Sequence, residues 1–84
     1  MRLRTNDLDW KQVDDEIIAL DRRDASYLTI NGSGSVLWRR LAEDASHPEL
    51  VTALVDAYEI DPVQARADTD AFLAELAQKG LLEE

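Results

Sequence analysis

Residues 26–38, S-Y-L-T-I-N-G-S-G-S-V-L-W, are the stretch that most constrains the fold. The first five favour a strand, because β-branched and aromatic side chains suit a pleated, half-buried surface. Residues 31–34 are typical of a turn, and Val36, Leu37 and Trp38 then begin a helical pattern. Strand-like segments precede this junction and helical segments follow it. We therefore predict that a small sheet meets a helical half here, and that the functional site lies at the junction.

Two further segments upstream of the junction favour strands. Residues 10–13 alternate apolar and polar side chains, and residues 16–21 are dense in β-branched residues. Short polar turns separate these segments from each other and from residues 26–30, which predicts an antiparallel meander. Residues 1–9 are expected to form either a frayed arm or an additional edge strand.

The alternation of side chains along a strand predicts which residues face the helices. Counting every second residue puts Ile18 and Leu20 on that face. The same count predicts that Leu28 and Ile30 also face the helices, whereas Tyr27 and Thr29 lie on the opposite face of the sheet.

Three helices are predicted after the junction. The first covers residues 33–43. The second begins after Ser46, which with Glu49 forms a capping-box pattern, and continues to Tyr58. The third begins after Asp61 and stops at Gly80. The order β-β-β-α-α-α predicts an α+β fold, a three-stranded antiparallel sheet followed by a three-helix bundle, as one domain over residues 1–84.

The third helix carries two different stripes. One is bulky and suits the core; it consists of Thr69, Phe72, Leu73 and Leu76. The other is small and lies beside Asp70; it consists of Ala67, Ala71 and Ala74. The alanines are explained either as good helix formers or as the wall of a groove. Asp70 and Glu75 are either solvated acids or contacts for a basic peptide side chain.

The charge balance bears on the partner. The chain has 18 acidic and 9 basic residues, and so a net charge of −9. Nucleic-acid binding needs a basic face, and the basic residues are dispersed, which disfavours a nucleic-acid partner and favours a basic or neutral peptide. No segment approaches the length of a membrane span, so a soluble, cytoplasmic protein with no membrane partner is expected.

No pattern of catalytic or metal-binding residues stands out. The chain has no cysteine and one histidine, His47, which we interpret as an exposed structural residue. The Gly32–Ser35 sequence G-S-G-S lacks the lysine and the spacing of a phosphate-binding loop. We therefore expect no enzyme activity, no catalytic residue, no cofactor and no metal.

Several motifs together resemble the PqqD-like proteins, also called precursor-peptide recognition elements of ribosomally synthesised and post-translationally modified peptides (RiPPs). The strand end L-T-I-N-G at residues 28–32, Trp38 four residues after Gly34, and the finish L-A-Q-K-G-L-L at residues 76–82 carry the resemblance. Trp10 and the acidic turn before residues 17–21 add to it, so that it covers nearly the whole chain.

This resemblance implies a winged-helix-like fold in which the leader of a precursor peptide adds as a further strand beside the third strand. The peptide-binding residues expected from it are Ser26, Tyr27, Leu28, Thr29 and Ile30 at the strand edge, with Ala67, Asp70, Ala71 and Ala74 as the cleft wall assigned from helical phase. The chain looks most like the stand-alone leader-binding adaptor of lasso-peptide biosynthesis, whose partners are a leader peptidase and a cyclase. The alternatives are a pyrroloquinoline-quinone-type chaperone for a radical-SAM enzyme and, less favoured, a winged-helix DNA-binding protein, which the absence of Lys and Arg from residues 48–58 opposes.

Overall fold

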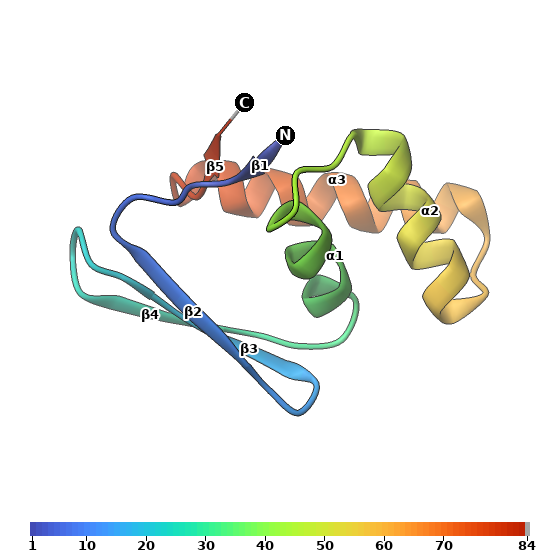
Figure 1. The fold of residues 1–84 in the computed structure, drawn as a ribbon. Helices are drawn as coiled ribbons and strands as arrows, with labels where there is room; N and C mark the ends of the chain where they lie inside the picture. The colour runs from blue at the N-terminus through green and yellow to red at the C-terminus, as the bar shows by residue number, and fades with distance from the viewer. Residues whose placement is uncertain (84) are drawn as a thin grey trace.

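The computed structural model describes residues 1–83. Figure 1 shows the sheet at one end and three helices at the other, with the long last helix crossing both parts. In chain order the elements are β1 (Arg2–Leu3), β2 (Leu8–Val13), β3 (Glu16–Asp21), β4 (Ser26–Ile30), α1 (Ser33–Leu41), α2 (His47–Tyr58), α3 (Pro62–Gln78) and β5 (Leu82–Glu83). None of the helices in the described part of the chain is both long and apolar enough to cross a membrane.

The main sheet has the strand order β2-β3-β4, and both of its strand pairs are antiparallel. The predicted α+β fold, with a three-stranded antiparallel sheet and three helices, is confirmed. β3 and β4 begin and end at the predicted residues, whereas β2 starts at Leu8, two residues before the prediction. β4 pairs with β3 on one side only, so its other side is an open edge within residues 1–83.

The predicted face of β3 is wrong by one residue. Ile17 and Ala19 are buried toward the helices, opposite Ile30 and Leu28, whereas Ile18 and Leu20 are only half-buried on the outer face. Four consecutive apolar residues give no alternation to count in this strand, so its phase depends on packing. Ala19 lies opposite Trp10, and its small side chain leaves room for the Trp10 ring.

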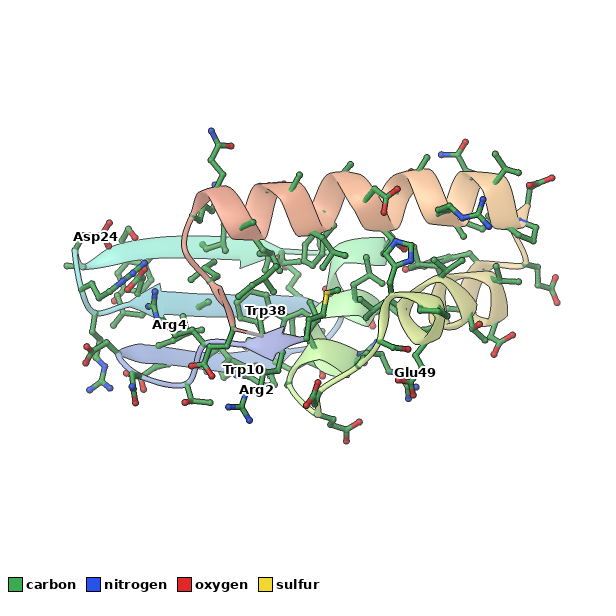
Figure 2. All side chains as sticks on the ribbon, turned by 90° about the horizontal axis from the view of Figure 1, so that it is seen from above. Arg2, Arg4, Trp10, Asp24, Trp38 and Glu49 are labelled. Atoms are coloured by element: carbon green, nitrogen blue, oxygen red, sulfur yellow. The ribbon has the colours of Figure 1, made fainter. Side chains whose placement is uncertain are left out.

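Trp10 and Trp38 connect the sheet to the helices. Their ring centroids lie 6.1 Å apart in an edge-to-face arrangement, a favourable geometry for aromatic pairs. Trp38 is fully buried, while Trp10 on β2 is 39% exposed. Figure 2 shows both rings in the layer between α1 and the sheet. The pair thus fixes α1 over the strands that precede it.

The helix caps are as predicted. Ser46 Oγ accepts from the Glu49 amide while the Ser46 amide donates to the Glu49 carboxylate at 2.9 Å, completing the capping box of α2. Asp61 caps α3 through the Val63 amide at 2.7 Å. Gly80 follows α3 with a φ of 71°, a left-handed conformation that favours glycine.

The first residues do not join the main sheet. β1 pairs antiparallel with β5 in a separate two-stranded sheet, which brings residues 2–3 beside residues 82–83. Figure 1 shows the two ends of the chain close together above the helices. Leu81 is buried next to this pairing, and its carbonyl accepts from the Arg4 amide at 2.8 Å. This pairing holds the end of α3 against the start of the chain.

Candidate functional site

The open edge of β4 lies beside α3. Figure 2 shows the helix running alongside this strand, on the side away from β3. Two adjoining grooves separate β4 from the helix, and both are lined by Leu28. We call the two together the β4–α3 trough. A trough beside an unpaired strand can hold a peptide, because the strand supplies main-chain partners and the trough accepts side chains.

The first groove has a volume of about 230 Å³ and lies at the Ile30 end of the strand. Its lining residues are Leu28, Thr29, Ile30, Asn31, Gly34, Phe72, Glu75 and Leu76. Ile30 and Leu76 are buried, and Phe72 is half-buried. The groove therefore has an apolar floor and one acidic side chain on its rim.

The second groove has a volume of about 370 Å³ and lies at the Ser26 end. Its lining residues are Asp21, Asp24, Ser26, Tyr27, Leu28, Gln78, Lys79 and Leu81. Leu81 is buried, whereas Tyr27 is 75% exposed. Asp24 accepts from the Ser26 amide at 3.1 Å and from its hydroxyl at 2.7 Å, which fixes the turn at this end.

Gly34 allows α1 to approach the first groove closely. A Cβ added to this residue would lie 2.7 Å from Ile30 Cγ2 and 3.1 Å from Phe72 Cε1. Both neighbours line the groove, so its shape depends on the absence of a side chain at residue 34. The G-S-G-S segment therefore allows close packing where the strand meets the helix.

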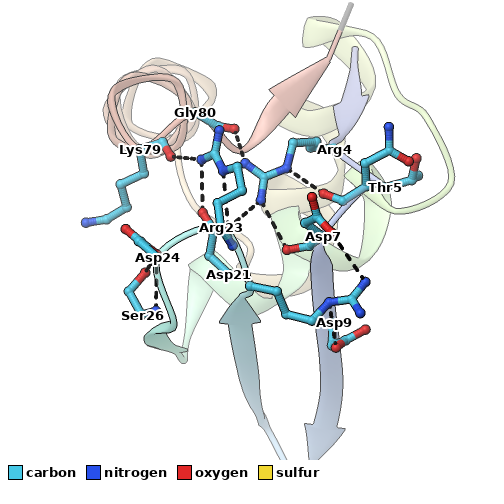
Figure 3. Close-up of polar contacts among 12 residues, drawn as sticks. Arg4, Thr5, Asp7, Asp9, Asp21, Arg23, Asp24, Ser26, Lys79 and Gly80 are labelled. Atoms are coloured by element: carbon cyan, nitrogen blue, oxygen red, sulfur yellow. Dashed lines mark hydrogen bonds and ion pairs between the residues drawn. The ribbon is translucent and has the colours of Figure 1, made fainter.

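A polar network closes the far end of the second groove (Figure 3). Arg4 Nη2 donates to Asp21 Oδ1 at 2.7 Å, and Arg23 Nη2 donates to Asp21 Oδ2 at 2.9 Å. The same guanidinium groups donate to the carbonyls of Gly80 at 2.8 Å and Lys79 at 3.2 Å. The bond from Arg23 is the main cause that lowers the pKa of Asp21, and Asp21 in turn raises the pKa of Arg23. The network fixes the end of α3 relative to β3.

The structure brings together only part of the predicted peptide-binding set. All five predicted residues of β4, Ser26–Ile30, line the trough. The four predicted residues of α3 are exposed and line neither groove; they are Ala67, Asp70, Ala71 and Ala74. Asp70 instead forms a hydrogen bond with His47 of α2, with 2.6 Å between Oδ1 and Nε2. The part of these four α3 residues in peptide binding stays a prediction.

Sequence reasoning missed most of the α3 residues that do line the trough. Phe72 and Leu76 carried the signal of core residues, and both also form the groove floor. Glu75 was expected either as a solvated acid or as a contact for a basic peptide side chain, whereas Gln78 and Lys79 were not assigned to the site. Glu75 lies three residues after Phe72, and Gln78 and Lys79 lie three and four residues after Glu75. This spacing places them on one helix face, a signal that was present in the sequence.

Among residues 1–83, no three His, Cys, Asp or Glu side chains are grouped so that they could hold a metal ion. His47 is paired with Asp70, and the neighbouring Ser46 hydroxyl accepts a hydrogen bond in the cap of α2. The trough is lined by apolar, hydroxyl, amide and charged side chains, which suit the binding of a peptide.

Comparison with known proteins agrees with this geometry. A structure described as "TbiB1 in Complex with the TbiA(beta) Leader Peptide" matches with a TM-score of 0.89 and 30% identity, covering 99% of this chain and 95% of that one. A second, "Lasso peptide synthetase B1 complexed with the leader peptide", matches with a TM-score of 0.84 and 25% identity, covering 99% and 96%. No curated protein sequence matches. The family model for coenzyme PQQ synthesis protein D (PqqD) matches residues 16–82. Because this match spans most of the chain, the protein belongs to the PqqD family, which confirms the resemblance found in its sequence.

Proposed function

We propose that this protein binds the leader segment of a ribosomally synthesised precursor peptide by strand addition at β4. The single observation that supports the proposal is the open β4 edge beside an apolar-floored trough. An added strand would form main-chain hydrogen bonds with Ser26–Ile30 and place alternate side chains in the trough. The two similar structures are both described as complexes with leader peptides, which supports a leader peptide as the ligand.

The expected affinity follows from the size of the site. A few main-chain hydrogen bonds contribute about 0.5–1.5 kcal/mol each, and two or three apolar anchors contribute about 1.5–3 kcal/mol each. Ordering a disordered peptide and restricting its motion cancel much of this gain. The dissociation constant should therefore lie between about micromolar and tens of nanomolar, which permits both capture and release.

We further propose that the whole of residues 1–84 is one non-catalytic adaptor domain that presents the leader to modifying enzymes. The lasso-peptide function is supported by the description of one similar structure as a lasso peptide synthetase B1 with its leader peptide; the partners that we propose for it are a leader peptidase and a cyclase. The PqqD family description supports the alternative of a chaperone in coenzyme PQQ synthesis, for which the proposed partner is a radical-SAM enzyme. A precursor reading frame next to genes for a peptidase and a cyclase would favour the lasso-peptide partners.

Hydrogen exchange can test strand addition directly. The probe is a synthetic leader of a candidate precursor peptide, added to the full chain. We expect the amides of Ser26–Ile30 that point away from β3, every second one, to gain protection, while amides of β2 at the opposite edge remain as before. Exchange unchanged in β4 despite measurable binding would reject the β4 edge as the site.

Backbone-modified peptides provide the control. In an added strand every second amide points toward the partner strand. Two leader peptides are compared, one N-methylated at every odd residue and the other at every even residue. The peptide whose methylated amides face β4 should bind at least about tenfold more weakly than the unmodified leader, whereas the other peptide should bind nearly as well. Equal affinity of the two methylated peptides would show that the leader does not bind as a strand.

A further inference from the structure

The rim of the β4–α3 trough carries two opposite charges from α3. Glu75 lines the first groove, at the Ile30 end, and Lys79 lines the second, at the Ser26 end. Beside Lys79, the guanidinium groups of Arg4 and Arg23 bind Asp21, so three basic side chains stand against the two carboxylates of Asp21 and Asp24 at this end. The first groove has no basic lining residue. The trough is therefore acidic at one end and basic at the other.

The two charged side chains are free to change partners. Lys79 Nζ lies 3.7 Å from Glu75 Oε1, and the side chains are 44% and 57% exposed. An ion pair this exposed is weak, since water and salt screen it. Separating the two groups to meet a peptide consequently costs little.

The spacing of the pair matches the repeat of a strand. Four residues of helix rise about 6 Å, and two residues of an extended strand advance about 6.6–6.8 Å. Side chains two apart on a strand point to the same face. Because α3 runs alongside β4, a guest strand between them would bring two such side chains opposite Glu75 and Lys79 (Figure 2).

We infer that Glu75 and Lys79 are specificity-determining residues that select a peptide with a basic and an acidic side chain two residues apart. The basic side chain faces Glu75 near Ile30, and the acidic one faces Lys79 near Ser26. This inference rests on the proposed strand addition at β4. It also fixes the register of the guest, because a slip by two residues would break one or both charge contacts and a slip by one would turn both side chains away.

Selection from a random library tests the inference without a known ligand. The probe is an mRNA-displayed library of randomised 12-residue peptides, selected against the native protein and against the charge-reversed variant Glu75→Lys/Lys79→Glu. We expect the native protein to enrich peptides with opposite charges at positions i and i+2. The reversed variant should enrich the same spacing with the signs exchanged.

Synthetic peptides then give the size of the effect. Each protein should prefer its own selected peptide over the charge-exchanged form by about tenfold, as expected for two exposed charge contacts. The matched control is Asp56→Lys/Arg66→Glu, which keeps the net charge and alters residues that do not line the trough. This control should retain the native preference.

The outcomes separate the inference from the proposed function. If peptides protect β4 amides from exchange but both proteins prefer the same charge order, the charge selection is wrong and strand addition stands. If no selected peptide protects β4, both are wrong. Should the reversed variant fail to fold, the single variants Glu75→Gln and Lys79→Gln replace it. Glu75→Gln is expected to abolish only the preference for the basic peptide side chain, and Lys79→Gln only the preference for the acidic one.

Discussion

Arg23 holds both carboxylate oxygens of Asp21, with 3.2 Å from Nε to Oδ1 and 2.9 Å from Nη2 to Oδ2. The same guanidinium also donates to the carbonyl of Lys79 at 3.2 Å. One side chain from the β3–β4 turn therefore connects the end of β3 to the end of α3. The width of the second groove depends on this connection, since Asp21 and Lys79 both line it.

The first prediction concerns acid stability. The pKa of Asp21 is lowered by the folded structure, so its carboxylate stabilises the fold fully above the unfolded-state pKa of about 3.9. This contribution is lost as the pH falls below that value toward the folded-state pKa. We expect the urea midpoint of Asp21→Asn to be lower than that of the native protein at pH 7, and the difference to shrink toward pH 3.

The control for this prediction is Asp9→Asn. Asp9 also contacts an arginine, with Arg22 Nε 3.2 Å from its Oδ2, but its side chain is 63% exposed. Exposed pairs add little to stability, so this variant should follow the native pH profile. An Asp21→Asn profile parallel to the native one would contradict the role assigned to Asp21.

The second prediction concerns the close approach at Gly34. Replacing a helical glycine by alanine ordinarily stabilises by about 1 kcal/mol, but overpacking costs about 1–3 kcal/mol. With a Cβ 2.7 Å from Ile30 Cγ2, the cost should exceed the gain, and we expect Gly34→Ala to lose about 1 kcal/mol in urea unfolding. Peptide affinity should fall as well, because Ile30 and Phe72 line the groove.

Gly32→Ala is the matched variant. Gly32 has a φ of 59° and no atom within 4 Å of an added Cβ, so alanine there strains the backbone without entering the groove. It should lower stability by about 1–2 kcal/mol and leave the affinity of the folded protein unchanged. Equal losses of affinity in both variants would indicate a general effect of instability.

The third prediction concerns the small-residue stripe of α3. If Ala71 and Ala74 wall the cleft, Ala71→Arg and Ala74→Arg should weaken leader binding in a fluorescence titration. Phe72→Ala should weaken it more, because Phe72 lines the first groove and the alanines line neither. Native affinity in both folded arginine variants would remove the stripe from the binding site.

The fourth prediction concerns the start of α2. The Ser46 amide donates to the Glu49 carboxylate, and hydrogen bonding by Ser46, chiefly through this amide, lowers the pKa of Glu49. Ser46→Ala removes half of the capping box and should lose about 1 kcal/mol of stability in urea unfolding. The exposed Thr52→Ala in the same helix should be neutral or slightly stabilising. A stable Ser46→Ala variant would show that the cap contributes little.

The sequence predicted those elements whose signals are local. The capping box at Ser46, the Asp61 cap and the glycine after α3 each depend on residues a few positions apart, and all appear in the structure. The same is true of β4, which polar residues and a glycine bound on either side.

Two features could not be predicted because they depend on distant contacts. The phase of β3 is set by the packing of Ala19 opposite Trp10 and by the two arginines that bind Asp21. The face of α3 that borders β4 is set by the rotation of the whole helix, which no local pattern fixes. Of the α3 residues that line the trough, Phe72, Leu76, Gln78 and Lys79 were missed for this reason.

The free side of β4 also makes this protein a partner for itself. A second copy could hydrogen-bond along the same five residues, as unprotected sheet edges generally allow. The excess of nine negative charges per copy opposes that encounter at low ionic strength. Added salt weakens the repulsion while leaving the hydrogen-bonding edge intact. Colloidal stability and cargo loading are therefore coupled, because a guest that fills the β4 edge withdraws that edge from pairing with a second copy.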